Sequence, residues 1–230
     1  MIIYITNEDY LRETYYNFDN WEKVEHDKII KIDCNNCGLD ALPDLSKCLQ
    51  LRTLYCQHNN LVRLPDLSKC KNLITLFCQH NNLIELSDLS KCWELNTLFC
   101  QHNNLTQLPD LSKCQQLTSL FCDYNNLAQL PDLSKCQQLT DLYCSHNKLI
   151  KLPDFLFGQE CNQLIDLCCG YNYLPRSKIP LQFKDISNEL QYHVNYVVTK
   201  IKRTRKRYHY LPMLRDSYNA DIRNAIICFM

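Results

Sequence analysis

The chain has 230 residues, 46% of them hydrophobic, and its 25 basic and 25 acidic side chains give a formal net charge of zero at pH 7. A chain of this length and apolar content can form a core in one or two domains. Because its basic and acidic residues balance, its composition does not call for a polyanionic partner. Only three glycines are present (Gly38, Gly158 and Gly170), so folds that need glycine for left-handed turns are disfavoured and asparagine is expected to form the turns.

The first 27 residues precede a repetitive region. Residues 1–9 lack the basic flank and apolar length of a signal peptide, and the chain contains no run of about 18 apolar residues. We therefore expect an intracellular, cytoplasmic or nuclear protein without a membrane span. Residues 1–27 are expected to cap the repeats; the alternative is a separate helical recruiting element, which their tyrosines and Trp21 fit equally well.

Residues 28–175 contain a sequence repeat with a period of 22. In one copy Leu73 is position 1, Leu76 is position 4, Cys78 is position 6 and Asn81 is position 9, with leucine at positions 11, 14 and 17 and cysteine at position 20. The first residues of the seven copies, the first and last being divergent, are Ile29, Leu51, Leu73, Leu95, Leu117, Leu139 and Leu164. The last copy begins 25 residues after its predecessor, which indicates a small insertion at residues 155–158.

The pattern L-x-x-L-x-C-x-x-N-x-L, read here from Leu73 to Leu83, resembles the leucine-rich-repeat family. The 22-residue length and the leucines at positions 14 and 17 look most like the short subclass of phosphatase-regulatory and internalin-type proteins. The repeated Leu-Pro-Asp-Leu-Ser-Lys-Cys segments are similar to repeat proteins of giant DNA viruses, which would place the chain in a host cell.

The resemblance implies an α/β repeat solenoid, a leucine-rich-repeat horseshoe flanked by N- and C-terminal caps. Its parallel sheet would line the concave side, and short 3-10 or helical turns would lie on the convex side. The resemblance also implies a non-catalytic module for protein–protein interaction.

The residue types explain how each copy would form one coil. Residues 75–79 alternate apolar and other side chains, which predicts a short strand with Leu76 and Cys78 pointing inward. Asn81 is expected to turn inside the coil and bond backbone groups there. Asn82 is expected to adopt the left-handed conformation, which asparagine accepts at lower cost than most residues.

The far side of each coil is expected to be a short helical return. Pro65 fixes φ at its entry, and Asp66 is suited to begin one helical or 3-10 turn over residues 67–70. Because one coil buries too little surface to balance the entropy of ordering its residues, the copies must stack.

Two cysteine positions recur in the repeats, at 6 and 20. Their members are Cys34, Cys56, Cys78, Cys100, Cys122, Cys144, Cys169 and Cys48, Cys70, Cys92, Cys114, Cys136, Cys161. We interpret them as small apolar core residues, because free buried cysteine behaves as one. The alternative is a metal or redox ladder, with Cys34 and Cys37 as a C-x-x-C pair, but Cys37 merely replaces the turn asparagine of its copy.

Positions 3, 5, 7 and 8 are expected to form columns on the outward, concave face of the strands. Position 5 is aromatic in five successive copies, and an exposed apolar stripe with a polar rim is typical of an interaction site. The candidate partner-binding residues are Thr53, Tyr55, Gln57, His58, Thr75, Phe77, Gln79, His80, Thr97, Phe99, Gln101, His102, Phe121, Asp123, Tyr124, Asp141, Tyr143 and His146. The alternative is that the rings only stack to stabilise neighbouring strands.

The histidines at position 8 raise the hypotheses of metal binding and of pH-sensitive partner binding. Tyr124 interrupts this column and no acidic residue accompanies each histidine, so we expect no metal ion and no cofactor. Cys78 is expected to point inward while its neighbours point outward, so Cys78 and His80 would not share a catalytic pocket. Phosphate-loop, nucleophile-elbow and zinc-protease motifs are absent from the sequence, and we expect no enzyme activity.

Residues 176–230 depart from the repeat and carry eleven basic but only four acidic residues, a net charge of +7. Apolar residues at helical spacing, among them Ile186, Leu190, Val194, Val197 and Val198, predict a capping helix. The basic run after it contains Lys200, Lys202, Arg203, Arg205, Lys206 and Arg207. This run is interpreted as a solvated helix end; the alternatives are a nuclear-localisation signal, an anionic-membrane patch, or nucleic-acid binding as the second functional hypothesis. We expect a monomer.

Overall fold

The structure is a computed structural model that describes residues 2–4, 18–157, 163–174 and 197–199, and the structural statements below concern these residues. No helix among them is both long enough and apolar enough to cross a bilayer.

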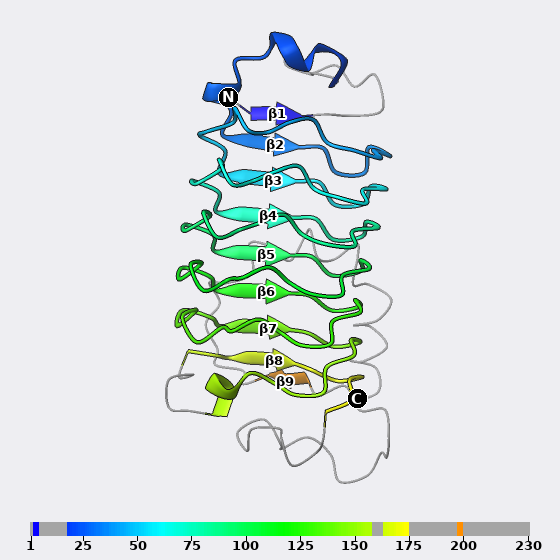
Figure 1. The fold of residues 1–230 in the computed structure, drawn as a ribbon, viewed down its shortest axis with the longest axis vertical. Helices are drawn as coiled ribbons and strands as arrows, with labels where there is room; N and C mark the ends of the chain where they lie inside the picture. Colours follow the sequence, from blue (N-terminus) through cyan, green and yellow to red (C-terminus); the bar gives the residue numbers. More distant parts are fainter. Residues whose placement is uncertain (1, 5–17, 158–162, 175–196, 200–230) are drawn as a thin grey trace. The chain divides into compact units, whose positions relative to one another are not determined.

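The described chain forms a solenoid with one sheet along its side (Figure 1). The sheet contains nine strands in sequence order, and β1 to β8 are parallel while β9 is antiparallel to β8. The strands are β1 (Ile2–Tyr4), β2 (Lys31–Asp33), β3 (Thr53–Tyr55), β4 (Thr75–Phe77), β5 (Thr97–Phe99), β6 (Ser119–Phe121), β7 (Asp141–Tyr143), β8 (Asp166–Cys168) and β9 (Val197–Thr199). The predicted repeat solenoid with a parallel sheet is confirmed.

The 22-residue period sets the strand register. Leu54 of β3 pairs with Leu76 of β4, and the same offset continues from β2 to β7. Between β7 and β8 the offset is 25, because Leu142 pairs with Leu167. The predicted insertion therefore exists, and the 3-10 helix η3 (Asp154–Phe157) occupies its beginning.

The core is one continuous cluster of leucines and cysteines inside the coils. Leu76 and Cys78 are both fully buried in it, as the alternation of residues 75–79 predicted. At the N-terminal side η1 (Phe18–Lys23) precedes η2 (His26–Lys28), and Trp21 of η1 belongs to the same core cluster. The Trp21 Nε1–H also donates a hydrogen bond to Asp44 O at 3.1 Å.

The position 9 asparagines lie inside the coils and bond two coils at once. Asn81 Nδ2 donates to Cys78 O at 3.1 Å in its own coil and to Cys56 O at 2.9 Å in the preceding coil, and its Oδ1 accepts from Leu61 N at 3.0 Å. The same pattern recurs at Asn59, Asn103, Asn125, Asn147 and Asn172. The predicted role of Asn81 is confirmed.

The left-handed residue of each coil is at position 8, so the prediction for Asn82 is wrong. The non-glycine residues with positive φ, between 51° and 56°, are Asn36, His58, His80, His102, Tyr124, His146 and Tyr171. The asparagine that follows must point inward directly after the strand, so the backbone has to reverse one residue before it. Chain reversal by histidine and tyrosine carries a steric cost that glycine would avoid.

The far side of the regular coils consists of tight turns, and the predicted single turn over residues 67–70 is present as one i→i+3 hydrogen bond of the 3-10 type. Leu67 O accepts from Cys70 N at 2.9 Å and Cys70 O from Leu73 N at 3.1 Å, which makes two successive turns too short for a helix. The predicted capping by Asp66 is confirmed, because its Oδ1 accepts from Ser68 N at 2.8 Å. The hydrogen bonds from Ser68 lower the pKa of the Asp66 carboxyl.

Val197 and Val198, predicted to be helical, lie instead in β9, where Val198 pairs with Leu167 of β8. At these positions the backbone forms hydrogen bonds to β8 instead of the hydrogen bonds of a helix. Ile186, Leu190 and Val194 lie outside the described residues.

Replacement of Asn81 by alanine is expected to lower the free energy of unfolding by about 2–4 kcal/mol, because it leaves several buried backbone groups without partners. Urea denaturation followed by circular dichroism measures this change. The control is Asn82→Ala, an exposed neighbour, for which we expect a change below about 0.5 kcal/mol. Equal losses in both variants would contradict the role assigned to the buried amide.

Candidate functional site

Five aromatic side chains form a stacked column on the face of the sheet that points away from the core. Tyr55, Phe77, Phe99, Phe121 and Tyr143 are absent from the core cluster that contains Leu76 and its equivalents. Successive ring centroids are 4.8, 4.5, 4.3 and 4.2 Å apart, with interplanar angles of 20° or less. The predicted outward direction of these side chains is therefore confirmed, and we call them the aromatic column.

The three central rings of the aromatic column are buried, so the prediction of an exposed apolar stripe is wrong for them. Phe77, Phe99 and Phe121 are 1%, 5% and 8% exposed, while Tyr55 and Tyr143 are partly exposed. The strand spacing places each ring flat against the next, so neighbouring rings cover both faces of every central ring. This geometry fits the alternative role of stabilising adjacent strands, and it leaves no central ring face open to a planar ligand.

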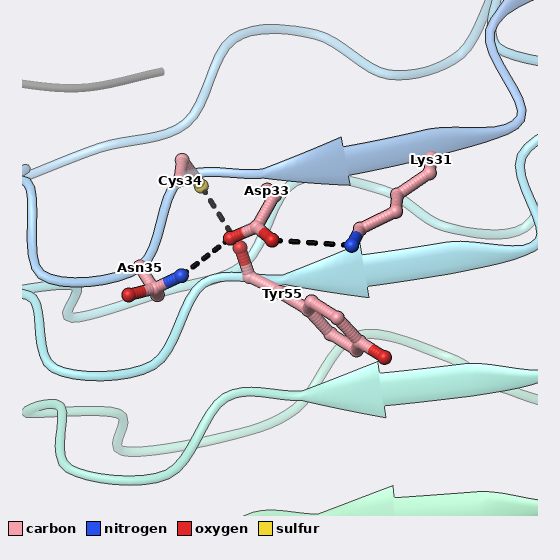
Figure 2. Close-up of polar contacts among 5 residues, drawn as sticks. All are labelled: Lys31, Asp33, Cys34, Asn35 and Tyr55. Carbon is pink, nitrogen blue, oxygen red and sulfur yellow. Dashed lines mark hydrogen bonds and ion pairs between the residues drawn. The ribbon is translucent and has the colours of Figure 1, made fainter. Parts of the chain in front are cut away.

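A polar cluster ends the aromatic column at β2 (Figure 2). Position 5 of this copy is Asp33, and its carboxylate pairs with Lys31 Nζ at 3.2 Å and accepts a hydrogen bond from Asn35 Nδ2. The same Lys31 Nζ lies 4.5 Å from the ring centroid of Tyr55, so a cation covers the terminal ring. At β8 position 5 is Cys168, which ends the column on the other side.

Glutamine amides flank the aromatic column on the strand-exit side. Gln57, Gln79 and Gln101 are all buried, and Gln101 is 0% exposed. Gln57 Oε1, Gln79 Oε1 and both amide atoms of Gln101 have no hydrogen-bond partner. Buried amides without partners are costly, so these three residues, which we call the glutamine column, are the least satisfied part of the described face.

The polar residues at position 3 lie on the other side of the aromatic column. Thr75 and Thr97 are buried, whereas Thr53 and Asp141 are partly exposed.

A second column of rings runs along the strand exits at position 8. Its members, with successive centroids 4.0–4.4 Å apart, are His58, His80, His102, Tyr124, His146 and Tyr171. All six are at least partly exposed, so this strand-exit column is the more accessible of the two. Sequence reasoning missed Tyr171, although an aromatic residue at position 8 of the divergent last copy was the available signal.

His80 has a strongly perturbed imidazole within the strand-exit column. Its Nε2 is buried without a hydrogen-bond partner. Burial, followed by the neighbouring imidazoles of His102 and His58, lowers the pKa of His80 to about 4. Burial also lowers the pKa of His58. The environments of His58 and His80 therefore favour neutral imidazoles.

Carboxylates gather on the outward face near β6 to β8. Asp123 accepts a hydrogen bond from Ser145 N at 2.8 Å, and Asp141 accepts one from Ser119 Oγ at 3.2 Å. Asp141 pairs in register with Asp166, whose pKa is raised to about 6 by burial and then by Asp141. Asp166 was missed because position 3 is not acidic in the regular copies before Asp141.

The described cysteines form neither disulfides nor metal clusters. All fourteen are buried and outside any disulfide, and no group of three or more potential metal ligands occurs among the described residues. Burial raises the pKa of the Cys48 thiol to about 12 and that of Cys70 to about 11. Cys78 lies in the core cluster, and burial raises the pKa of its thiol well above its usual range, which opposes activation of Cys78 as a nucleophile.

The candidate nucleic-acid residues lie outside the described part of the chain. They are Lys200, Lys202, Arg203, Arg205, Lys206 and Arg207.

The comparisons with known proteins agree with the repeat geometry. The family described as Leucine Rich repeats (2 copies) matches residues 49–91. No curated protein matches the chain.

Among solved structures, the plant peptide hormone receptor RGFR1 in complex with RGF2 is 25% identical with a TM-score of 0.52, covering 64% of this chain and 24% of the receptor. YopM from Yersinia enterocolitica WA-314 is 33% identical with a TM-score of 0.49, covering 59% of this chain and 28% of YopM. The functional domain of InlJ from Listeria monocytogenes is 25% identical with a TM-score of 0.38, covering 69% of this chain and 43% of that domain. The match thus spans less than half the length of each of these proteins.

The fourteen described thiols are expected to resist alkylation in the folded protein, because the reactive thiolate is suppressed and access is blocked. Treatment with iodoacetamide at pH 8, followed by peptide mass spectrometry, measures modification at each position. The same reaction in urea is the control and should label all of them. Rapid labelling of Cys78 or Cys100 in the native protein would contradict their placement in the core.

Proposed function

Since the chain is a leucine-rich-repeat protein, we propose that it is a binding module that holds a protein or peptide partner on the outward face of its sheet. Repeat proteins use such continuous faces for recognition because each coil adds one row of side chains. The face here combines the aromatic column, the glutamine column and the strand-exit column.

The unpaired amides of the glutamine column carry the proposal. Gln57, Gln79 and Gln101 stand in successive coils, and each has at least one buried amide atom without a hydrogen-bond partner. These amides are covered in the free chain, so a partner pairs with them only after they turn outward, and a polypeptide main chain supplies both the N–H and the C=O groups that they need. The glutamine column therefore favours a polypeptide.

The aromatic column acts in this proposal as a rigid support. Its central ring faces are covered by neighbouring rings, so the column is poorly suited to stack on nucleobases and serves to hold the adjacent polar side chains in fixed positions. The partly exposed Tyr55 and Tyr143 and the strand-exit column supply accessible contacts. Preorganised side chains lose little entropy on binding, which favours affinity.

A receptor of similar fold supports the proposal. The plant receptor RGFR1 is described as a peptide hormone receptor in complex with RGF2, and its TM-score to this chain is 0.52. That binding belongs to the receptor, and we extend to this chain only the general use of a leucine-rich-repeat surface for a peptide.

We propose a non-catalytic role, because burial suppresses the thiolate form of the described cysteines. Intracellular location, viral origin and a monomeric state stay predictions from the sequence. Nucleic-acid binding by the run from Lys200 to Arg207 also stays a prediction, for which steep weakening of binding with salt is the expected signature.

The triple variant Gln57→Leu/Gln79→Leu/Gln101→Leu tests the proposed face. Leucine has a similar size and needs no hydrogen bonds, so we expect the free energy of unfolding to stay equal or rise while partner binding weakens at least about tenfold. Peptides selected on the wild-type chain from a phage-displayed random library serve as probes, with affinities measured by fluorescence anisotropy.

The matched control is Gln115→Leu/Gln137→Leu/Gln138→Leu, three exposed glutamines in the turns on the far side of the coils. We expect the selected peptides to bind this control as they bind the wild type. Peptides that bind the sheet-face variant unchanged, or lose affinity only for the control, would overturn the proposal.

A further inference from the structure

We infer that three consecutive histidines of the strand-exit column form an acid-sensitive latch, which holds the exits of β3 to β5 together when neutral and loosens them when protonated. These residues, His58, His80 and His102, are called the histidine triplet. The inference concerns a conformational device within the solenoid, and it does not require that the proposed partner be correct.

The latch combines a ring stack with a backbone ladder in the same residues. The ring centroids of the histidine triplet are 4.4 and 4.2 Å apart with interplanar angles of 11°. The backbone N–H of each residue donates to the next coil, from His58 to Gln79 O at 3.0 Å, from His80 to Gln101 O at 3.1 Å and from His102 to Asp123 O at 3.0 Å. The ring stack and the ladder of backbone hydrogen bonds therefore join the same consecutive coils.

The surroundings of His80 oppose its protonation. An imidazole lies against each face of its ring, and its buried Nε2 has no acceptor to receive a new N–H. Each histidine of the triplet directly follows a neutral glutamine of the glutamine column, and at the C-terminal end the ring of Tyr124 stacks on His102 while Asp123 precedes Tyr124 in the chain. The Asp123 carboxylate belongs to a coil two positions along the stack from that of His80, and it accepts a hydrogen bond from Ser145 N.

The direction of the effect follows from the pKa of His80, which is about 4 in the folded chain against about 6.5 in an unfolded one. Between these values the unfolded chain binds more protons than the folded chain. The contribution of His80 to stability is complete above pH 6.5 and is lost as the pH falls toward 4. Asp166 has the opposite sign, because its raised pKa makes the folded carboxyl bind protons more readily, so the triplet must be isolated by substitution.

The strand-exit column contains a natural template for that substitution. Tyr124 takes the same left-handed backbone conformation and stacks on His102 at 4.3 Å, and its phenol ring has no basic nitrogen to protonate. His146 stands between Tyr124 and Tyr171 at 4.1 and 4.0 Å and has no imidazole neighbour in the column. Histidine-to-tyrosine replacements therefore preserve the stack while removing protonation sites.

The experiment compares the full-length wild type, His58→Tyr/His80→Tyr/His102→Tyr and the control His146→Tyr in urea denaturation at pH 7.5 and pH 5.0. We expect the midpoints of the wild type and the control to fall similarly on acidification, and the triple variant to lose at most about half as much. Equal losses in all three proteins, or no loss in the wild type, would overturn the latch.

If the triple variant does not fold at pH 7.5, two measurements replace it. The single variant His80→Tyr should still reduce the acid-induced loss. Nuclear magnetic resonance of wild-type histidine side chains should show His80 titrating below pH 5, and titration near pH 6.5 would overturn the inference.

Discussion

The buried asparagine amides are the interaction on which the rest of the structure depends. Each one, such as Asn81, satisfies carbonyl groups in its own coil and in the preceding coil, and accepts a backbone N–H from that same preceding coil. The turn after every strand thereby has one possible register, because an unpaired buried backbone group would be costly. This register converts a position in the 22-residue repeat into a fixed place on the solenoid.

Because the strands pair in register, each outward side chain lies beside the same type of residue in the next coil, about one strand spacing away. Neutral rings benefit, and Phe77 and Phe99 stack at 4.5 Å with an angle of 3°. Titratable groups do not benefit from such neighbours. Burial first, and like neighbours second, lower the pKa of His80 and raise that of Asp166, so both groups favour their neutral forms. The same geometry thus makes the aromatic column rigid and the histidine triplet sensitive to acid.

Sequence periodicity predicted the direction of each side chain but not its exposure. The inward placement of Cys78, the outward placement of Phe77 and the bonding role of Asn81 all follow from alternation and residue type. The burial of Phe77 does not, because it depends on how closely identical rings approach in neighbouring coils. The left-handed conformation at His80 also escaped prediction, since residue preferences favour Asn82 while the geometry demands reversal before the inward asparagine.

The charged side chains on the outward face occur where a copy departs from the repeat pattern. The central coils are uniform and neutral there, with phenyl groups beside amides, whereas Lys31 and Asp33 occupy the first strand of the repeats. Asp141 and Asp166 meet in register near the other end, where burial first and Asp141 second raise the pKa of Asp166, so the carboxylate pair adds a repulsive cost to that of burial. A charged residue repeated in every coil would impose that cost throughout the stack. In-register stacking therefore favours uncharged outward side chains in the central coils and charged ones only toward the ends.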